Sequence, residues 1–156
     1  MAVRELTRET RPYFVERLQR IHSVEQRLWG TLSPEGLMRH LRTSVEISLG
    51  EGPKTPGLSI PVVRTVLRAL FFHWFTKWPG GWIKAPASFT PPADADLDQE
   101  REALLGVIDR FLDAVDADAE HLAPNMLLGP QPLGYYGRIH GVHFEHHFRQ
   151  YGVDDA

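Results

Sequence analysis

Residues 136–151 constrain the fold more than any other segment, because this helical pattern carries histidines on an apolar face. Four of the chain's eight histidines lie in it, at His140, His143, His146 and His147. At about 100° per residue, three of these share one helical face with aromatic side chains: His140, His143 and His147 with Tyr136, Phe144 and Tyr151. Imidazoles are costly to bury unless their nitrogens are used, and a metal ion is the commonest user. The segment therefore predicts either a metal or catalytic site or an unusually polar buried helix.

Spacing separates these histidines into different roles. His143 and His147 are four residues apart, so their side chains lie about 6 Å apart on adjacent turns and can bind one ion. His140 and His147 are separated by about 10.5 Å of helix rise, which makes them a poor pair for a single metal. His146 points about 100° away from His147 and is expected to flank the site. Catalytic zinc-type sites use three protein ligands, so another ligand must come from elsewhere in the chain.

The chain has no cysteine, so the third ligand must be histidine, aspartate or glutamate. The best candidate is His40, on a helix that is expected to begin after Ser33 with Pro34 at its first position. On that helix His40 faces the core beside Leu37 and other apolar residues. A lone core-facing histidine is more often a hydrogen-bonded core residue than a ligand. The matching histidine pair on another helix favours the ligand interpretation of His40.

The rest of the chain predicts one all-α domain over residues 1–156. Apolar periodicity places helices at residues 11–29, 34–49, from 96 or 98 to 115, and 136–151. Residues 50–57 form a loop with three glycines and two prolines, and residues 123–134 are a connection broken by proline and glycine.

An aromatic-rich crossover, residues 60–92, lies between the second and third of these long helices. It contains three of the four tryptophans, Trp74, Trp78 and Trp82. Aromatic packing onto the other helices is the simpler interpretation. The alternative is that these tryptophans form a wall of the substrate pocket or a dimer surface, because long crossovers often carry function.

Several classes of protein are disfavoured by composition and motifs. A net charge of −3 offers no basic face to a nucleic acid. No Glu-x-x-His, His-Glu-x-x-His or glycine-rich phosphate loop occurs, which removes the usual di-iron bundle, metalloprotease and nucleotide sites. The apolar run of the crossover is too short and too charged for a membrane helix, and the N-terminus lacks the apolar core of a signal peptide. A cytoplasmic location is therefore expected, with no nucleic acid or membrane partner.

Residues 143–150 fit the pattern HxxHHxRQ and are followed by Tyr-Gly. This pattern resembles the last helix of the DinB-like superfamily, and most closely the branch that ends in a motif like HxxHHLRQFG. Residues 29–41 resemble the entry to the second helix of the same branch, and residues 84–111 resemble its approach to the third. The likeness therefore covers most of the chain.

This resemblance implies a DinB/YfiT-like four-helix bundle with an extra helical crossover between helices 2 and 3. In that superfamily one histidine of helix 2 and an i, i+4 pair of helix 4 hold a divalent metal, which carries over to His40, His143 and His147. The imidazole donors suit Zn or Ni, with Fe as a further option. The groups expected to hydrogen-bond around these ligands are His146, Gln150 and Tyr136.

Two functions from different classes follow. Several characterised relatives in the superfamily are metal-dependent thiol-transferases, so the resemblance implies a transferase or hydrolase that acts on a small molecule with a low-molecular-weight thiol. The competing interpretation is a non-catalytic, metal-stabilised bundle that serves as a binding or dimerisation module, for example in a homodimer. An open fourth position on the metal would favour chemistry, and a fourth protein ligand would favour a structural ion.

Overall fold

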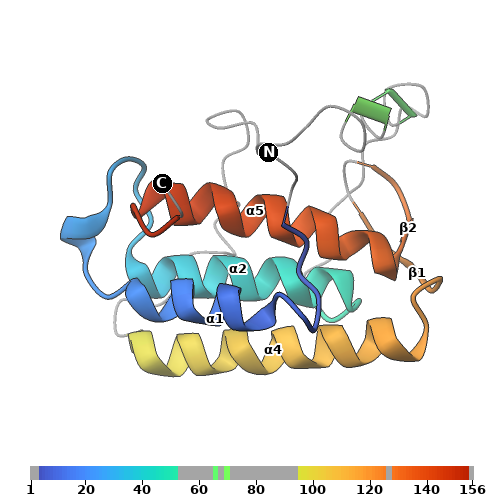
Figure 1. Ribbon diagram of the computed structural model, residues 1–156, viewed down its shortest axis with the longest axis horizontal. Coiled ribbons are helices and arrows are strands. Elements are labelled where there is room, and N and C mark those ends of the chain that lie inside the picture. Colours follow the sequence, from blue (N-terminus) through green and yellow to red (C-terminus); the bar gives the residue numbers. More distant parts are fainter. Residues whose placement is uncertain (1–3, 53–64, 67–68, 71–94, 126–127, 155–156) are drawn as a thin grey trace.

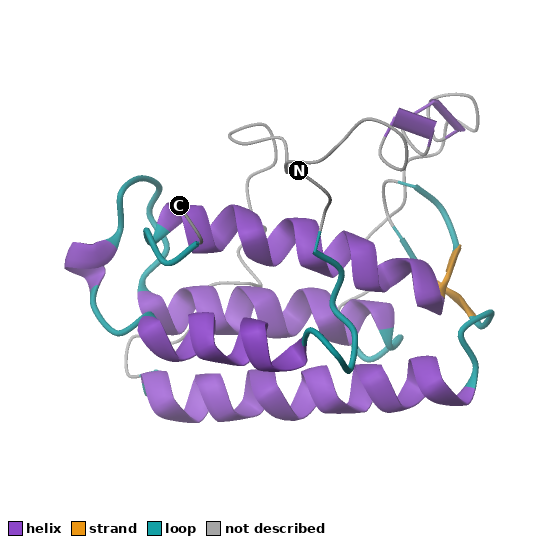
Figure 2. Ribbon diagram, viewed as in Figure 1, coloured by secondary structure: helices purple, strands orange, loops and turns teal. Residues whose placement is uncertain are grey.

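Helices dominate the computed structural model, which describes residues 4–52, 65–66, 69–70, 95–125 and 128–154 (Figure 1). Over these residues there are four long helices: α1 (Arg11–Arg20), α2 (Pro34–Ser48), α4 (Leu97–Ala117) and α5 (Tyr136–Gln150). Helix α2 packs against both α4 and α5, and α1 also packs against α4 and α5. Figure 2 shows the four running along the same long direction, with α5 above α2. No helix in these described ranges is long and apolar enough to cross a membrane.

The predicted starts of helices α2 and α4 are confirmed by their capping residues. The Ser33 hydroxyl accepts from the Gly36 amide at 3.2 Å, and Pro34 opens α2. The Asp96 carboxylate accepts from the Gln99 amide at 2.8 Å, and acidic residues fill the first turn of α4. Each cap satisfies an amide that has no partner within its helix. The local sequence therefore fixes where α2 and α4 begin.

Helix α1 is shorter than the predicted range of residues 11–29, because it ends at Arg20. Just beyond it, Ser23 accepts from the Glu25 amide at 3.1 Å, and the Gln26 side chain accepts from the Ser23 amide at 3.1 Å. These bonds form a capping box that starts a short 3₁₀ helix at Val24–Gln26. Side-chain bonds of this kind compete with continuation of an α-helix. Leu28, which lies in the predicted range but beyond the observed helix, is 69% exposed.

A two-stranded sheet lies in the connection between α4 and α5. Strand β1 (Leu122–Ala123) pairs antiparallel with β2 (Gln131–Pro132), and a 3₁₀ helix at Leu133–Tyr135 leads into α5. Each strand has two residues, too few for a period of two to show in the sequence. The molecule is therefore mostly helical with a small sheet, rather than purely helical.

Of the crossover, only residues 65–66 and 69–70 are described, and these are helical. Trp74, Trp78 and Trp82 lie outside the described residues, so their assignment to a pocket wall stays a prediction.

Helix α5 is held from both sides. On one side Phe14 of α1 packs against Phe144 and Phe148, with ring centroids 5.7 and 6.0 Å apart. On another side the N-terminal segment crosses the helix, and the Leu6 amide donates to the Gly137 carbonyl at 2.8 Å. A Cβ atom at Gly141 would lie 2.1 Å from the Arg4 carbonyl oxygen, so this crossing requires glycine there. These contacts fix the helix that carries the histidines.

Candidate metal centre

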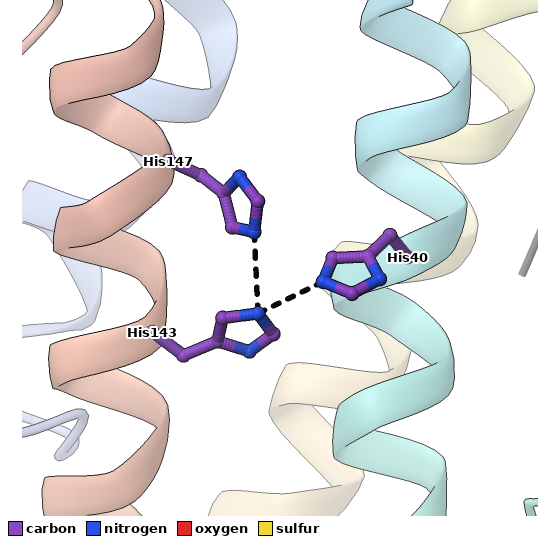
Figure 3. A group of neighbouring side chains, drawn as sticks. All are labelled: His40, His143 and His147. Carbon is purple, nitrogen blue, oxygen red and sulfur yellow. Dashed lines mark hydrogen bonds between the residues drawn. The ribbon is translucent and has the colours of Figure 1, made fainter. Parts of the chain in front are cut away.

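Three histidines converge between α2 and α5 (Figure 3). His40 Nε2 lies 2.9 Å from His143 Nε2, and His147 Nε2 lies 3.2 Å from the same atom. One ligand atom from each residue lies within 4.8 Å of the others, close enough to hold a metal ion. The structure thus brings together the three residues selected by spacing and by resemblance.

Burial keeps these imidazoles neutral. It lowers the pKa of His40 to about 4 and that of His147 to about 3, and it holds the pKa of His143 well below its usual value. Repulsion between the neighbouring histidines lowers these pKa values further. A neutral imidazole is the form that binds a metal ion.

Gln150 fixes the tautomer of His147. Its Nε2 donates to the Trp29 carbonyl oxygen at 2.9 Å, and its Oε1 lies 2.7 Å from His147 Nδ1. Because a carbonyl can only accept, the amide nitrogen must face Trp29, and Oε1 must accept the hydrogen of His147 Nδ1. The lone pair of His147 therefore sits on Nε2, which faces the other two histidines.

Ser44 orients His143. Its hydroxyl oxygen lies 3.2 Å from both the Leu41 carbonyl oxygen and His143 Nδ1. The bond at Nδ1 leaves Nε2 of His143 facing His40 and His147. A metal ion bound there would use the Nε2 lone pair, with the hydrogen of the neutral ring on Nδ1.

The spacing also fits an ion. A metal that is about 2.0–2.1 Å from each nitrogen of a tetrahedral site holds those nitrogens about 3.3–3.4 Å apart. The observed separation of 3.2 Å between the Nε2 atoms of His143 and His147 is close to that value, whereas the 2.9 Å between those of His40 and His143 is shorter, so His40 would move outward by a few tenths of an ångström on binding an ion.

A family model described as "Protein of unknown function (DUF1569)" matches residues 2–152. The chain belongs to this family. No curated protein and no solved structure matches this chain. The description of the DUF1569 family names no activity.

His140 has a different environment from the three converging histidines. Its Nε2 lies 3.0 Å from the Ser48 hydroxyl, which itself donates to the Val45 carbonyl at 2.6 Å. Its ring packs against Phe111 and Tyr136, with centroids 5.0 and 5.5 Å away. Burial lowers its pKa to about 3. His140 is thus a buried residue one turn before His143 on α5, and its Nε2 faces Ser48.

The groups expected to surround the candidate ligands are placed unequally. Gln150 contacts His147 as predicted, whereas His146 meets His147 only through its ring, with centroids 4.9 Å apart. Tyr136 was expected near the candidate ligands because it shares their helical face. It lies at the first position of α5, and its hydroxyl donates to the Pro124 carbonyl in the connection before that helix. The seven residues from Tyr136 to His143 correspond to about 10.5 Å of helix rise, so sharing a face did not bring it close.

Sequence reasoning missed the role of the loop that precedes α2. The Leu28 amide donates to the Gln150 carbonyl at 2.8 Å, so this loop is fastened to the end of α5, where the two meet at the left of Figure 1. Gly30 has a left-handed φ of 82°, and a Cβ there would lie 2.1 Å from Gln150 Nε2. This glycine, next to an aromatic residue, was the signal available in the sequence.

Proposed function

We propose that this protein is a divalent-metal-dependent enzyme of the DinB-like superfamily that acts on a small molecule, as a thiol-dependent transferase or a hydrolase. His40, His143 and His147 would hold the metal. The observation that carries the proposal is the convergence of their neutral imidazoles, with the Nε2 atoms of the α5 pair turned inward while their Nδ1 atoms bond to Gln150 and Ser44.

The residues of the centre contribute orientation and desolvation. Hydrogen bonds from Gln150 and Ser44 hold the two α5 rings, so little reorganisation is needed when an ion binds. His143 and His147 are both 6% exposed, which keeps water away from the back of the site. His40 is partly exposed and marks the side from which a ligand can approach.

When bound, a divalent ion with three imidazole ligands supplies a Lewis acid that lowers the pKa of a thiol or a water molecule at its remaining position. Zn or Ni suits the donor set, and Fe is a further option. The group contains no carboxylate, so the charge of the ion is not compensated within it. An anionic fourth ligand such as a thiolate is therefore favoured. The chain has no cysteine, so that thiol must come from a partner molecule.

The arrangement of the helices supports the superfamily assignment. Each long helix packs against two others, and the proposed ligands come from the two helices that carry them in the DinB-like four-helix bundle.

The test is turnover by the metal-loaded protein with a panel of low-molecular-weight thiols and small electrophiles, read by loss of free thiol for transfer and by loss of the electrophile without thiol for hydrolysis. Activity should require added metal, disappear in His143→Ala and persist in His121→Ala, whose side chain is exposed. Full activity in the metal-free His143→Ala variant would contradict the proposal. Binding of metal without any turnover across the panel would instead support the non-catalytic module.

A further inference from the structure

Trp29 is exposed although its backbone is held firmly. The residue has 44% of its surface exposed, in a loop whose next residue, Gly30, has a left-handed conformation. Its carbonyl accepts from Gln150, and the preceding amide donates to the Gln150 carbonyl. Leaving a large apolar ring in water forgoes the free energy of burying it. A fixed and exposed indole is a surface suited to binding.

This indole is connected to the candidate metal centre through His146. Its ring meets the ring of His146 edge-on, with centroids 4.9 Å apart. The His146 ring in turn lies 4.9 Å from that of His147. Two ring contacts therefore lead from the exposed tryptophan to a proposed metal ligand.

One side chain sets the position of both groups. The amide of Gln150 bonds to the Trp29 carbonyl through its nitrogen and to His147 Nδ1 through its oxygen. The close approach depends on Gly30, because any Cβ there would collide with Gln150. The tryptophan and the ligand histidine are thus fixed relative to each other, which reduces the entropy lost when a ligand touches both.

We propose that Trp29 forms a binding platform for an apolar or aromatic arm of the ligand whose thiol or anionic end occupies the remaining position on the metal. This rests on the proposed function and narrows its substrate class. The preferred ligands are small molecules with a metal-binding end and a flat apolar group. Burying such a group on the indole adds affinity that a short polar ligand does not gain.

The test uses cobalt-substituted protein and two thiols, benzyl mercaptan and 2-mercaptoethanol. Binding is followed by the thiolate-to-cobalt charge-transfer absorption, which needs no turnover. Trp29→Ala keeps the backbone carbonyl that Gln150 needs and removes only the ring. Leu28→Ala is the matched control, because Leu28 is the neighbouring apolar side chain and is 69% exposed.

The protein and its Leu28→Ala variant should bind benzyl mercaptan about tenfold more tightly than 2-mercaptoethanol. A difference of this size corresponds to the free energy of burying one apolar group. In Trp29→Ala this preference should fall to about twofold or less. An unchanged preference in Trp29→Ala would overturn the platform. Absence of any charge-transfer band with either thiol would instead count against the proposed function, since the metal would then have no position for a thiolate.

Discussion

Helix α5 carries two kinds of buried histidine on one face. His143 and His147 meet His40 with their Nε2 atoms, whereas His140 bonds to Ser48 and packs between aromatic rings. Burial lowers the pKa of all three α5 residues, so neutrality does not distinguish them. The partners do. A histidine becomes a candidate ligand where neighbouring groups occupy its Nδ1 and leave its Nε2 facing other imidazoles.

Removal of His140 should show the largest effect on folding. Its ring is 2% exposed, and His140→Ala would leave a cavity beside Phe111 and Tyr136. The free energy of unfolding should fall by about 2–4 kcal/mol, as for other large-to-small changes in a core. Urea denaturation measures this effect. The exposed His22→Ala control should change stability by less than about 0.5 kcal/mol. Equal stability of the two variants would show that His140 is not a packing residue.

Gly141 tests the packing of α5 on the side of the N-terminal segment. In Gly141→Ala the new Cβ would meet the Arg4 carbonyl at 2.1 Å, so the segment must shift, at a cost of about 1–3 kcal/mol. In Gly106→Ala the Cβ meets nothing within 4 Å inside α4. That change should stabilise the protein by about 0.5–1 kcal/mol. Thermal unfolding of both variants checks the prediction, and effects of the same sign would contradict it.

Ser44 and Ser48 offer a matched pair, since they lie one turn apart on α2 and bond to His143 and His140 respectively. Ser44→Ala should weaken metal affinity by about 10–100-fold, because an outer hydrogen bond orients a ligand. Ser48→Ala should leave affinity within about threefold and lower stability by about 1 kcal/mol. Metal titration by calorimetry distinguishes the two. Equal losses of affinity would mean that His140 belongs to the centre.

Acid should destabilise the metal-free protein, and His140 should contribute to that. Its folded pKa of about 3 is below the unfolded value of about 6.5, so the unfolded state binds more protons between these values. Stability therefore falls as the pH drops below about 6.5, by up to about 1.4 kcal/mol per pH unit for this one histidine. Denaturation of chelator-treated protein between pH 7 and 4 should give a shallower slope in His140→Ala. An identical slope would show that folding does not lower the pKa of His140.

How far the sequence predicted the molecule depended on whether a feature is local. The helix starts at Ser33 and Asp96 are local and were predicted, and so was the i, i+4 pair. His40 was identified only through its core-facing position and the family resemblance. The early end of α1 was missed because the apolar periodicity continues to residue 28. The hydrogen bonds of Ser23 and Gln26 start a separate 3₁₀ helix and end the α-helix before that point.

The contacts that complete the site join distant residues, and periodicity cannot predict these. Gln150 hydrogen-bonds to Trp29, which is 121 residues away in the sequence. Only the fold brings the α1–α2 loop to the end of α5. Tyr136 shows the opposite failure. It shares a helical face with the ligands, but its hydroxyl is engaged at the start of α5. A face defines direction around a helix, whereas contact also requires the same height along it.

The most direct test of the account is the metal content of the protein and of four single alanine variants, purified without a metal-affinity tag and measured by elemental analysis. The protein and His140→Ala should each hold about one divalent ion per chain, because His140 faces Ser48. The variants that lack a proposed ligand, His40→Ala, His143→Ala and His147→Ala, should each hold almost none. An empty His140→Ala beside a full His40→Ala would contradict the assignment of the centre.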